Sequence, residues 1–251
     1  MAKTFAWSGE RLPTLEAFQD YVNKTDLSWA VGLTYHHSWR PLPAQWRGSL
    51  TMNALKQDYM TREDGTWDSG PHLFVASGSP DPNNDGFWIG TPLSRSGIHA
   101  GKCNSDHIGI EIIGDYDYEP WQGRVRDWAY GVGIIILNKL GKSPNKTSVT
   151  GHRECLNNKS CPGNAINMDV VRAELSARMA LPAGTFPVSP MFLDAWTSSG
   201  GVWKGTGILT PGYAISEAFS KDGMMYQNFQ RATARLKNNH VIEWLFKAEQ
   251  P

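Results

Sequence analysis

The chain has 251 residues, of which 40% are hydrophobic and 19% charged, and its 24 basic and 24 acidic side chains give a formal net charge of zero. This composition is typical of a globular protein and excludes the strong positive field that draws proteins to nucleic acid or to anionic membranes. The longest apolar run, Val132 to Leu137, is far shorter than the roughly 20 residues that cross a bilayer. We therefore expect neither a nucleic-acid nor a membrane partner.

In chain order, the hydrophobic patterns predict a helix at 14–22, a strand at 29–35, a helix at 49–62, strands at 71–76, 87–90 and 108–114, and helices at 124–140 and 167–179. Thr14 is a typical N-cap for the first helix, and Gly141 closes the one that ends at 140. Strands interleaved with helices indicate an α/β domain over residues 1–180.

The segment 181–190 contains three prolines and a glycine and has no helical period, so we interpret it as a linker. Residues 191–251 then form a small C-terminal α+β module, with a short helix at 191–196 and short strands at 224–229, 232–236 and 241–246. A module of this size has a marginal core of its own. Such a module either provides a second binding contact or stabilises the first domain.

The N-terminus and the cysteines bear on where the chain is made. Residues 1–7 have no continuous apolar region with a small-residue cleavage site, so no secretory signal is predicted and synthesis in the cytoplasm is expected. Three cysteines, an odd number, do not describe a disulfide framework. We expect Cys103 and Cys155 to be buried or bystander thiols, with Cys161 free to be a metal ligand.

The loop from Gly151 to Gly163 contains the residue types of a metal site. His152 and Cys161 are nine positions apart, and Lys159 lies two residues before the cysteine. Zinc accepts imidazole nitrogen and thiolate, and a hydrolytic zinc site usually has three protein ligands and an open position. The best candidates for the third ligand are His36 and His37, which follow the strand predicted at 29–35. Adjacent residues of a strand point to opposite faces, so only one of them can readily face the metal.

Glu111 interrupts the apolar strand predicted at 108–114. Such a run is typical of a central strand covered on both faces. A carboxylate there must be paired, protonated or part of a functional cleft, because burying an unpaired charge is costly. Desolvation would raise its pKa toward the range that suits a general base near neutral pH. The alternative is a buried glutamate paired with an arginine or lysine.

Four segments together resemble the zinc-dependent N-acetylmuramoyl-L-alanine amidases, the family that includes phage endolysins and peptidoglycan recognition proteins. They contain Tyr35-His36-His37-Ser38, Gly97-Ile98-His99-Ala100-Gly101 with Asn104, Ile108-Gly109-Ile110-Glu111, and Gly151-His152-Arg153 through Lys159-Ser160-Cys161-Pro162-Gly163. The resemblance implies a central mixed β-sheet flanked by helices. It also implies one zinc ion held by His36, His152 and Cys161.

The same resemblance implies roles for further residues. Some members have a tyrosine where this chain has Pro71, which has no proton to exchange, whereas others carry a glutamate at the position of Glu111. Glu111 is thus expected to handle the proton, and Lys159 to stabilise the oxyanion. Three further residues are expected at the substrate cleft: His37, with a surface or supporting role, His99 and Asn104.

The expected activity is hydrolysis of the amide bond between N-acetylmuramic acid and L-alanine in bacterial peptidoglycan. We expect a monomeric, phage-type endolysin that is made in the host cytoplasm and acts on the cell wall after release. Two alternatives stay open. One is a cytoplasmic amidase that recycles muropeptides, which would not need a linker and a tryptophan-containing tail. The other is a non-catalytic peptidoglycan-recognition module, which would be expected to lack a zinc ligand.

Overall fold

The computed structural model describes residues 4–157, 159–180, 216–221, 224–229, 232–236 and 242–246. The chain divides into two compact units, Met1–Ser176 and Ala177–Pro251, which are treated separately below. The predicted linker at 181–190 and the predicted helix at 191–196 lie outside the described residues.

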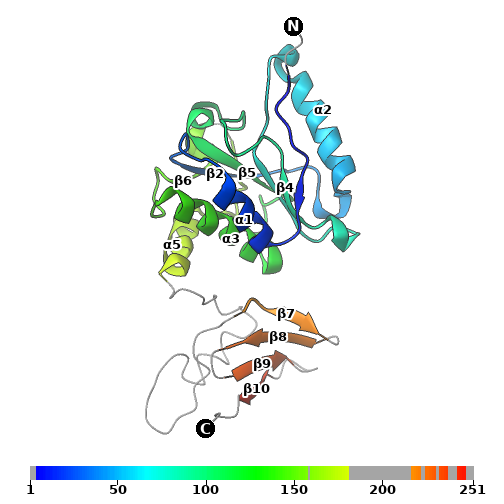
Figure 1. Ribbon diagram of the computed structural model, residues 1–251, viewed down its shortest axis with the longest axis vertical. Helices are drawn as coiled ribbons and strands as arrows, with labels where there is room; N and C mark the ends of the chain where they lie inside the picture. Colours follow the sequence, from blue (N-terminus) through cyan, green and yellow to red (C-terminus); the bar gives the residue numbers. More distant parts are fainter. Residues whose placement is uncertain are drawn as a thin grey trace. The chain divides into compact units, whose positions relative to one another are not determined.

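The first unit is built on a six-stranded mixed sheet in the order β1-β4-β3-β5-β2-β6 (Figure 1). Its strands are β1 (Arg11–Leu12), β2 (Gly32–His37), β3 (Leu73–Ala76), β4 (Gly86–Ile89), β5 (His107–Ile112) and β6 (Val149–Gly151). Strands β3, β5, β2 and β6 run parallel, whereas β4 pairs antiparallel with β3, and β1 with β4. The structure confirms the predicted α/β class with a central mixed sheet.

Helices connect the strands. The α-helices are α1 (Leu15–Lys24), α2 (Ser49–Gly65), α3 (Gly123–Leu140), α4 (His152–Cys155) and α5 (Met168–Met179). Short 3-10 helices occur at η1 (Pro43–Gln45), η2 (Pro82–Asn84) and η3 (Gly101–Ser105). The Thr14 hydroxyl accepts a hydrogen bond from the Ala17 amide and so caps α1, as predicted. Gly141 takes the left-handed conformation (φ 64°) that ends α3.

Alternation along the strands divides the side chains between two faces of the sheet. On one face, Tyr35 donates its hydroxyl to the Ala129 carbonyl of α3, and Phe87 packs against Phe18 of α1 and Trp128 of α3. Figure 1 shows α1 and α3 together on this side. On the other face, α2 packs on an apolar cluster. Its buried members are Trp46, Met52, Tyr59, Phe74, Ala76, Trp88 and Ile113.

The central strand β5 shows why the fold brings polar groups into the interior. All six residues of β5 are buried, as predicted for a strand covered on both faces. Ile110 and Ile112 lie on the face that carries α3, because side chains alternate along a strand. Glu111 therefore points to the opposite face, the one that α2 covers only in part.

The described part of the second unit is a four-stranded antiparallel sheet in the order β10-β9-β8-β7. Its strands are β7 (Phe219–Lys221), β8 (Met224–Asn228), β9 (Ala232–Leu236) and β10 (Ile242–Phe246). Three of these strands were predicted, and β7 was not. The small core forms around Phe229 and Ala234, with Trp244 against Phe229 at 5.1 Å between ring centroids.

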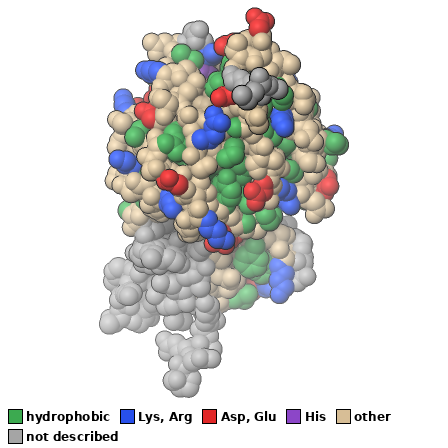
Figure 2. All heavy atoms as spheres, turned by 45° about the horizontal axis from the view of Figure 1, so that its top comes forward, with side chains coloured by type: hydrophobic (Ala, Val, Ile, Leu, Met, Phe, Trp, Pro, Cys, Tyr) green, Lys and Arg blue, Asp and Glu red, His purple; other side chains and the backbone are tan. Residues whose placement is uncertain are grey.

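Two further observations concern the hydrophobicity of the helices and the distribution of charge on the surface. Among the described residues, no helix is both long and apolar enough to cross a membrane. On the face of the first unit drawn in Figure 2, acidic and basic side chains are interspersed rather than gathered by sign.

Candidate metal and catalytic site

The candidate site forms where three neighbouring parallel strands end. In the register of β2 and β5, His36 is the direct partner of Glu111. In the register of β2 and β6, Tyr35 is the partner of Gly151, so His152 follows next to His36. The carboxyl ends of parallel strands lie at the same edge of a sheet, and residues paired in register on neighbouring strands point to the same face. Strand pairing thus places Glu111, His36 and His152 side by side.

Three potential metal ligands converge there. Ligand atoms of His36, His152 and Cys161 all lie within 4.8 Å of one another. His36 Nδ1 is 3.6 Å from Cys161 Sγ, and the rings of His36 and His152 are 4.6 Å apart between centroids. Glu111 Oε1 lies 3.7 Å from the same Nδ1. The structure brings together the three predicted ligands and the predicted proton carrier.

A hydrogen-bonded chain through His99 orients His36. His99 Nε2 lies 3.0 Å from the His107 carbonyl, which can only accept, so His99 carries its proton on Nε2. His99 Nδ1 then accepts from His36 Nε2 at 3.0 Å. The neutral His36 ring consequently has its free lone pair on Nδ1, the nitrogen that faces Cys161. A partner that fixes the tautomer in this way is common behind metal-binding histidines.

Gly109 leaves space for the His99 ring in this series of hydrogen bonds. A Cβ atom at Gly109 would lie 2.5 Å from Cγ of His99, so a larger residue in β5 would displace the His99 ring. The Gly109 amide also donates to Nδ1 of the buried His72 at 2.9 Å. Gly109 belongs to the Ile-Gly-Ile-Glu segment, but its contact with His99 exists only in the folded protein and has no signal in the sequence.

Burial keeps the imidazoles neutral, which is the form that binds metal. Desolvation lowers the pKa of His36 and of His99 well below the usual value, with neighbouring histidines adding to the shift for both. Desolvation, with a contribution from Lys159, lowers the pKa of His152 to about 4. Burial also raises the pKa of the Cys161 thiol, which a bound cation would oppose.

These residues fit zinc. His152 Nε2 is buried and finds no hydrogen-bond partner among the described residues, although buried polar atoms are nearly always paired. A metal ion would satisfy this nitrogen. Two imidazoles and a thiolate are ligands that zinc prefers, and three protein ligands leave a position for water or substrate.

Arg153 holds the loop that carries Cys161. Its amide donates to the Cys161 carbonyl at 2.8 Å, and its guanidinium donates to the carbonyls of Ser160 (2.9 Å) and Gly163 (2.8 Å), as well as to that of Ile166. One side chain thereby fixes both sides of the ligand. Arg153 follows His152 in the recognised motif, but its role depends on loop geometry that the sequence does not display.

Glu111 is buried, with 8% of its surface exposed. Desolvation raises the pKa of its carboxyl from 4.5 to about 8, opposed by the charge of Arg62. In the metal-free protein the group thus stays protonated at neutral pH. A carboxyl that exchanges its proton near neutral pH suits general acid and base catalysis.

We expect this carboxyl to make the stability of the metal-free protein depend on pH. Between pH 4.5 and 8 the folded Glu111 keeps a proton that the unfolded chain has released, so its contribution falls as the pH rises. The change is on the order of 5 kcal/mol. The free energy of unfolding, measured by urea denaturation across this range, should decrease more steeply in the wild type than in Glu111→Gln.

The buried histidines contribute with the opposite sign, because their lowered pKa values favour folding as the pH rises toward 6.5. They are present in both proteins, so the difference between the two pH profiles isolates Glu111. Parallel profiles would contradict the raised pKa.

The site opens into a cleft of about 880 Å³. Its walls include Trp39, Arg40 and Tyr59, together with Glu111 and the three potential ligands. Lys159, predicted to face the reacting carbonyl, also lines the cleft.

The remaining predicted cleft residues have different positions. His37 and His99 line the cleft, and the His37 amide donates to Cys161 Sγ at 3.4 Å. His37 Nδ1 accepts from the Tyr116 amide, and the side chain lies near Asp115 and Asp117 rather than with the ligand trio. Asn104 is not among the described residues that line the cleft. Its side chain binds the backbone of the loop that carries His99.

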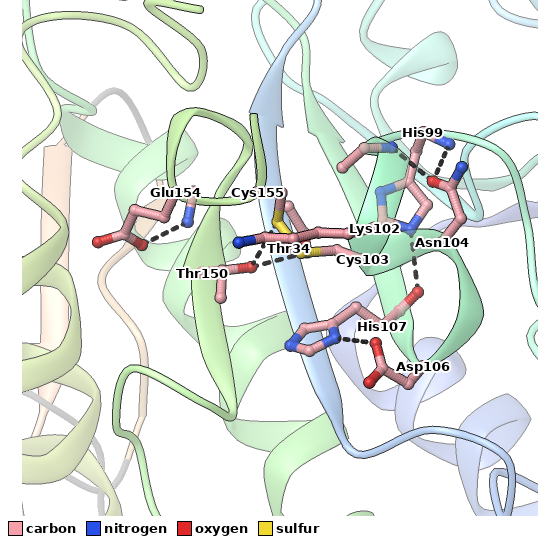
Figure 3. The surroundings of a disulfide bond; sticks show 12 residues. Thr34, His99, Lys102, Cys103, Asn104, Asp106, His107, Thr150, Glu154 and Cys155 are labelled. Carbon is pink, nitrogen blue, oxygen red and sulfur yellow. Dashed lines mark hydrogen bonds and ion pairs between the residues drawn. A yellow bond between two sulfur atoms is a disulfide. The ribbon is translucent and has the colours of Figure 1, made fainter. Parts of the chain in front are cut away.

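The prediction of free thiols at two cysteines is wrong. Cys103 and Cys155 form a disulfide across 52 residues of chain, with their Cα atoms 5.9 Å apart (Figure 3). Cys161 is the free cysteine, as expected. An odd cysteine count argues against complete pairing, but it does not exclude one bridge beside one ligand. The sequence gives no signal for the approach of η3 to α4.

This geometry defines a class of protein. It is an α/β domain that carries a group of two histidines and a cysteine at the carboxyl ends of its parallel strands. The family model of N-acetylmuramoyl-L-alanine amidases matches residues 31–164, more than half of the chain. The chain belongs to this family. The match includes all strands from β2 to β6 and every potential ligand.

Known structures with a similar fold were also found. A mutant of Drosophila PGRP-LB in complex with tracheal cytotoxin has 24% identity and a TM-score of 0.44, covering 56% of this chain and 79% of the other. The endolysin amidase LysCS from Clostridium intestinale has 18% identity and a TM-score of 0.42, covering 59% and 84%. The Manduca sexta Peptidoglycan Recognition Protein-1 has 14% identity and a TM-score of 0.41, covering 57% of this chain and 77% of the other. No curated protein matches the sequence.

Proposed function

We propose that this protein is a zinc-dependent N-acetylmuramoyl-L-alanine amidase that cleaves peptidoglycan as a phage-type endolysin. The observation that carries the proposal is the convergence of His36, His152 and Cys161 beside Glu111 at the floor of an open cleft. Membership of the amidase family supplies the bond that is cut, between N-acetylmuramic acid and L-alanine.

In this proposal His36, His152 and Cys161 would hold one zinc ion. When bound, the ion would supply Lewis-acid chemistry at the scissile carbonyl and would lower the pKa of water. Glu111 takes a proton from the attacking water and returns it to the departing amine of L-alanine. Lys159 lies at the cleft, where its positive charge stabilises the negative charge that develops on the carbonyl oxygen.

The main alternative is a peptidoglycan-recognition module without activity. Such a module needs the cleft but neither a complete ligand set nor a proton carrier. This chain keeps all three candidate ligands and a buried carboxyl 3.7 Å from one of them. Retaining a buried ionisable group is costly unless it serves a purpose, so the geometry favours the enzyme.

The disulfide favours a site of action outside the cytoplasm. Disulfides persist in oxidising environments and are rare in cytosolic proteins. A bridge between Cys103 and Cys155 therefore suits an enzyme that works on the cell wall after release, and it argues against cytoplasmic recycling of muropeptides. Labelling of free thiols in protein from the cytoplasm and from the lysate would test this, since equal labelling of Cys103 at both locations would contradict it.

Removal of the metal tests the proposed function. Treatment with a chelator should lower the rate at which purified cell walls lose turbidity by roughly 100-fold or more, because the Lewis acid contributes several kcal/mol to the reaction. Added zinc should restore the rate, whereas added magnesium should not, because magnesium binds thiolate poorly. Full activity in the chelated protein would exclude a zinc enzyme.

We also propose that the second unit binds the cell wall. A second weak contact raises the effective concentration of an enzyme at an insoluble substrate. The described strands expose Phe219, which stacks on Tyr226 at 5.6 Å between ring centroids, and aromatic faces suit sugar rings.

Deletion of residues 187–251 should reduce the fraction of protein that sediments with purified cell walls by about 10-fold or more. Activity on a soluble muropeptide should stay within about two-fold, because the site lies in the first unit. Unchanged sedimentation of a folded truncation would show that the second unit serves stability instead.

A further inference from the structure

We propose that the Cys103–Cys155 disulfide positions the metal site by fastening the loop that carries His99 to the helix that begins with His152. The inference rests on the metal site of the proposed function. It assigns to the two cysteines a role in metal affinity, beyond the general stability that any disulfide gives.

The first end of the disulfide belongs to the support of His36. Cys103 lies in η3, next to Asn104, whose Oδ1 accepts from the amides of His99 (2.8 Å) and Ala100 (2.6 Å). Figure 3 shows Asn104 directed at this backbone and His99 directed at the His107 carbonyl. Since His99 sets the tautomer of His36, a displacement of η3 would reach a metal ligand through two hydrogen bonds, from Asn104 to the His99 backbone and from the His99 ring to His36.

The second end belongs to a metal ligand directly. His152 and Cys155 are the first and last residues of α4, which is only four residues long. A helix of this length is not stable alone, because one turn fixes several residues for few hydrogen bonds. Glu154 supports α4 by accepting from the Gly151 amide and pairing with Arg172, but both contacts lie away from η3.

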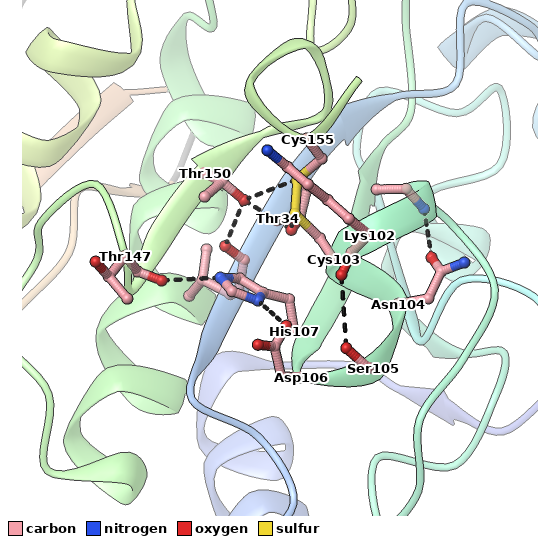
Figure 4. Close-up of polar contacts among 12 residues, drawn as sticks. Thr34, Lys102, Cys103, Asn104, Ser105, Asp106, His107, Thr147, Thr150 and Cys155 are labelled. Carbon is pink, nitrogen blue, oxygen red and sulfur yellow. Dashed lines mark hydrogen bonds and ion pairs between the residues drawn. A yellow bond between two sulfur atoms is a disulfide. The ribbon is translucent and has the colours of Figure 1, made fainter. Parts of the chain in front are cut away.

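The bridge is built into the interior. Cys103 and Cys155 are 7% and 4% exposed and pack with Ala100. Thr150 and Thr34 join their hydroxyls at 2.8 Å, and these hydroxyls lie 3.5 Å and 3.9 Å from Cys155 Sγ (Figure 4). These threonines come from β6 and β2, the strands that lead to His152 and His36. A shielded bridge of this kind suits a permanent clamp rather than an exposed redox sensor.

The disulfide thus joins η3 to α4, which no other disulfide links. Each of these segments positions one histidine ligand, η3 acting on His36 through His99 and α4 carrying His152 itself. Without the disulfide, the loop and the helix would be held to each other by side-chain contacts alone. Metal affinity is higher when the ligands are already in position. If they are not, part of the binding free energy is used to order them.

The test is the zinc affinity of the full-length variant Cys103→Ala/Cys155→Ala, measured by competition with a chromophoric chelator. We expect the dissociation constant for zinc to rise about 10- to 100-fold, the usual effect of disturbing the support of a ligand. Substitution is preferable to reduction, because two free thiols could bind zinc themselves. Cobalt(II) in place of zinc gives a second readout, since its visible absorption should change if the ligand geometry changes.

Val22→Ala is the matched control, because Val22 is fully buried in α1 on the face of the sheet opposite the site. Its zinc affinity and cobalt spectrum should equal those of the wild type at a temperature where both proteins are folded. Unchanged affinity in the cysteine variant would overturn the inference, and so would an equal loss in Val22→Ala. If the alanine pair does not fold, Cys103→Ala/Cys155→Val restores apolar volume without the bond and is judged by the same criteria.

The two proposals fail in different ways. A wild type that binds no zinc overturns the proposed function together with the clamp. A wild type that binds zinc and cleaves peptidoglycan, beside a cysteine variant with the same zinc affinity and cobalt spectrum, overturns the clamp alone.

Discussion

Replacement of Glu111 by glutamine is expected to lower the rate of peptidoglycan hydrolysis by about 100- to 10,000-fold, the range that a general acid and base contributes. Glutamine keeps the shape of the side chain but can neither take a proton from water nor return one to the amine. The cleft offers no substitute at position 71, where Pro71 lines the wall without an exchangeable proton.

The measurement is the initial rate on purified cell walls, with bound zinc determined by elemental analysis of the same sample. Zinc should stay near one ion per chain, because Glu111 is not one of the three converging ligands. Glu119→Gln, at an exposed glutamate, is the matched control and should keep wild-type activity. Near-normal activity in the Glu111 variant would assign the proton to another group.

The second large effect is expected at Cys161. Cys161→Ser replaces a thiolate by a hydroxyl that rarely ionises, so the zinc dissociation constant should rise by more than about 100-fold, beyond the effect of changing a supporting residue. Isothermal titration with zinc would measure this directly, and hydrolysis should fall in parallel at limiting zinc.

Ser160→Ala is a suitable control, because it changes the neighbouring side chain while the Ser160 carbonyl can still accept from Arg153. Its affinity should equal that of the wild type. A Cys161→Ser protein that retains zinc and activity at the wild-type level would remove Cys161 from the ligand set.

Much of the fold follows from local patterns. The continuous apolar run predicts strand β5. Apolar residues at helical spacing, with caps at Thr14 and Gly141, predict α1 and α3. Strands β1 and β6 were not predicted, because segments of two or three residues are too short to show a period. They form because partner strands supply their hydrogen bonds, which is a tertiary effect.

The site was predictable in part. Family resemblance named His36, Glu111, His152 and Cys161, but it could not say why they meet. The reason is strand register, since β5, β2 and β6 lie next to one another although they are far apart in the chain. The disulfide escaped prediction for the same reason, because the approach of η3 to α4 exists only in the folded protein.

Chemical analysis of the ends produced by digestion tests the central claim most directly. Purified peptidoglycan would be incubated with the zinc-loaded protein, and with Glu111→Gln as the control, and new amino groups and new reducing sugars would be quantified. The account predicts that free amino groups of L-alanine appear with the wild type alone and that reducing sugars do not increase. New reducing ends without new L-alanine amines would contradict it.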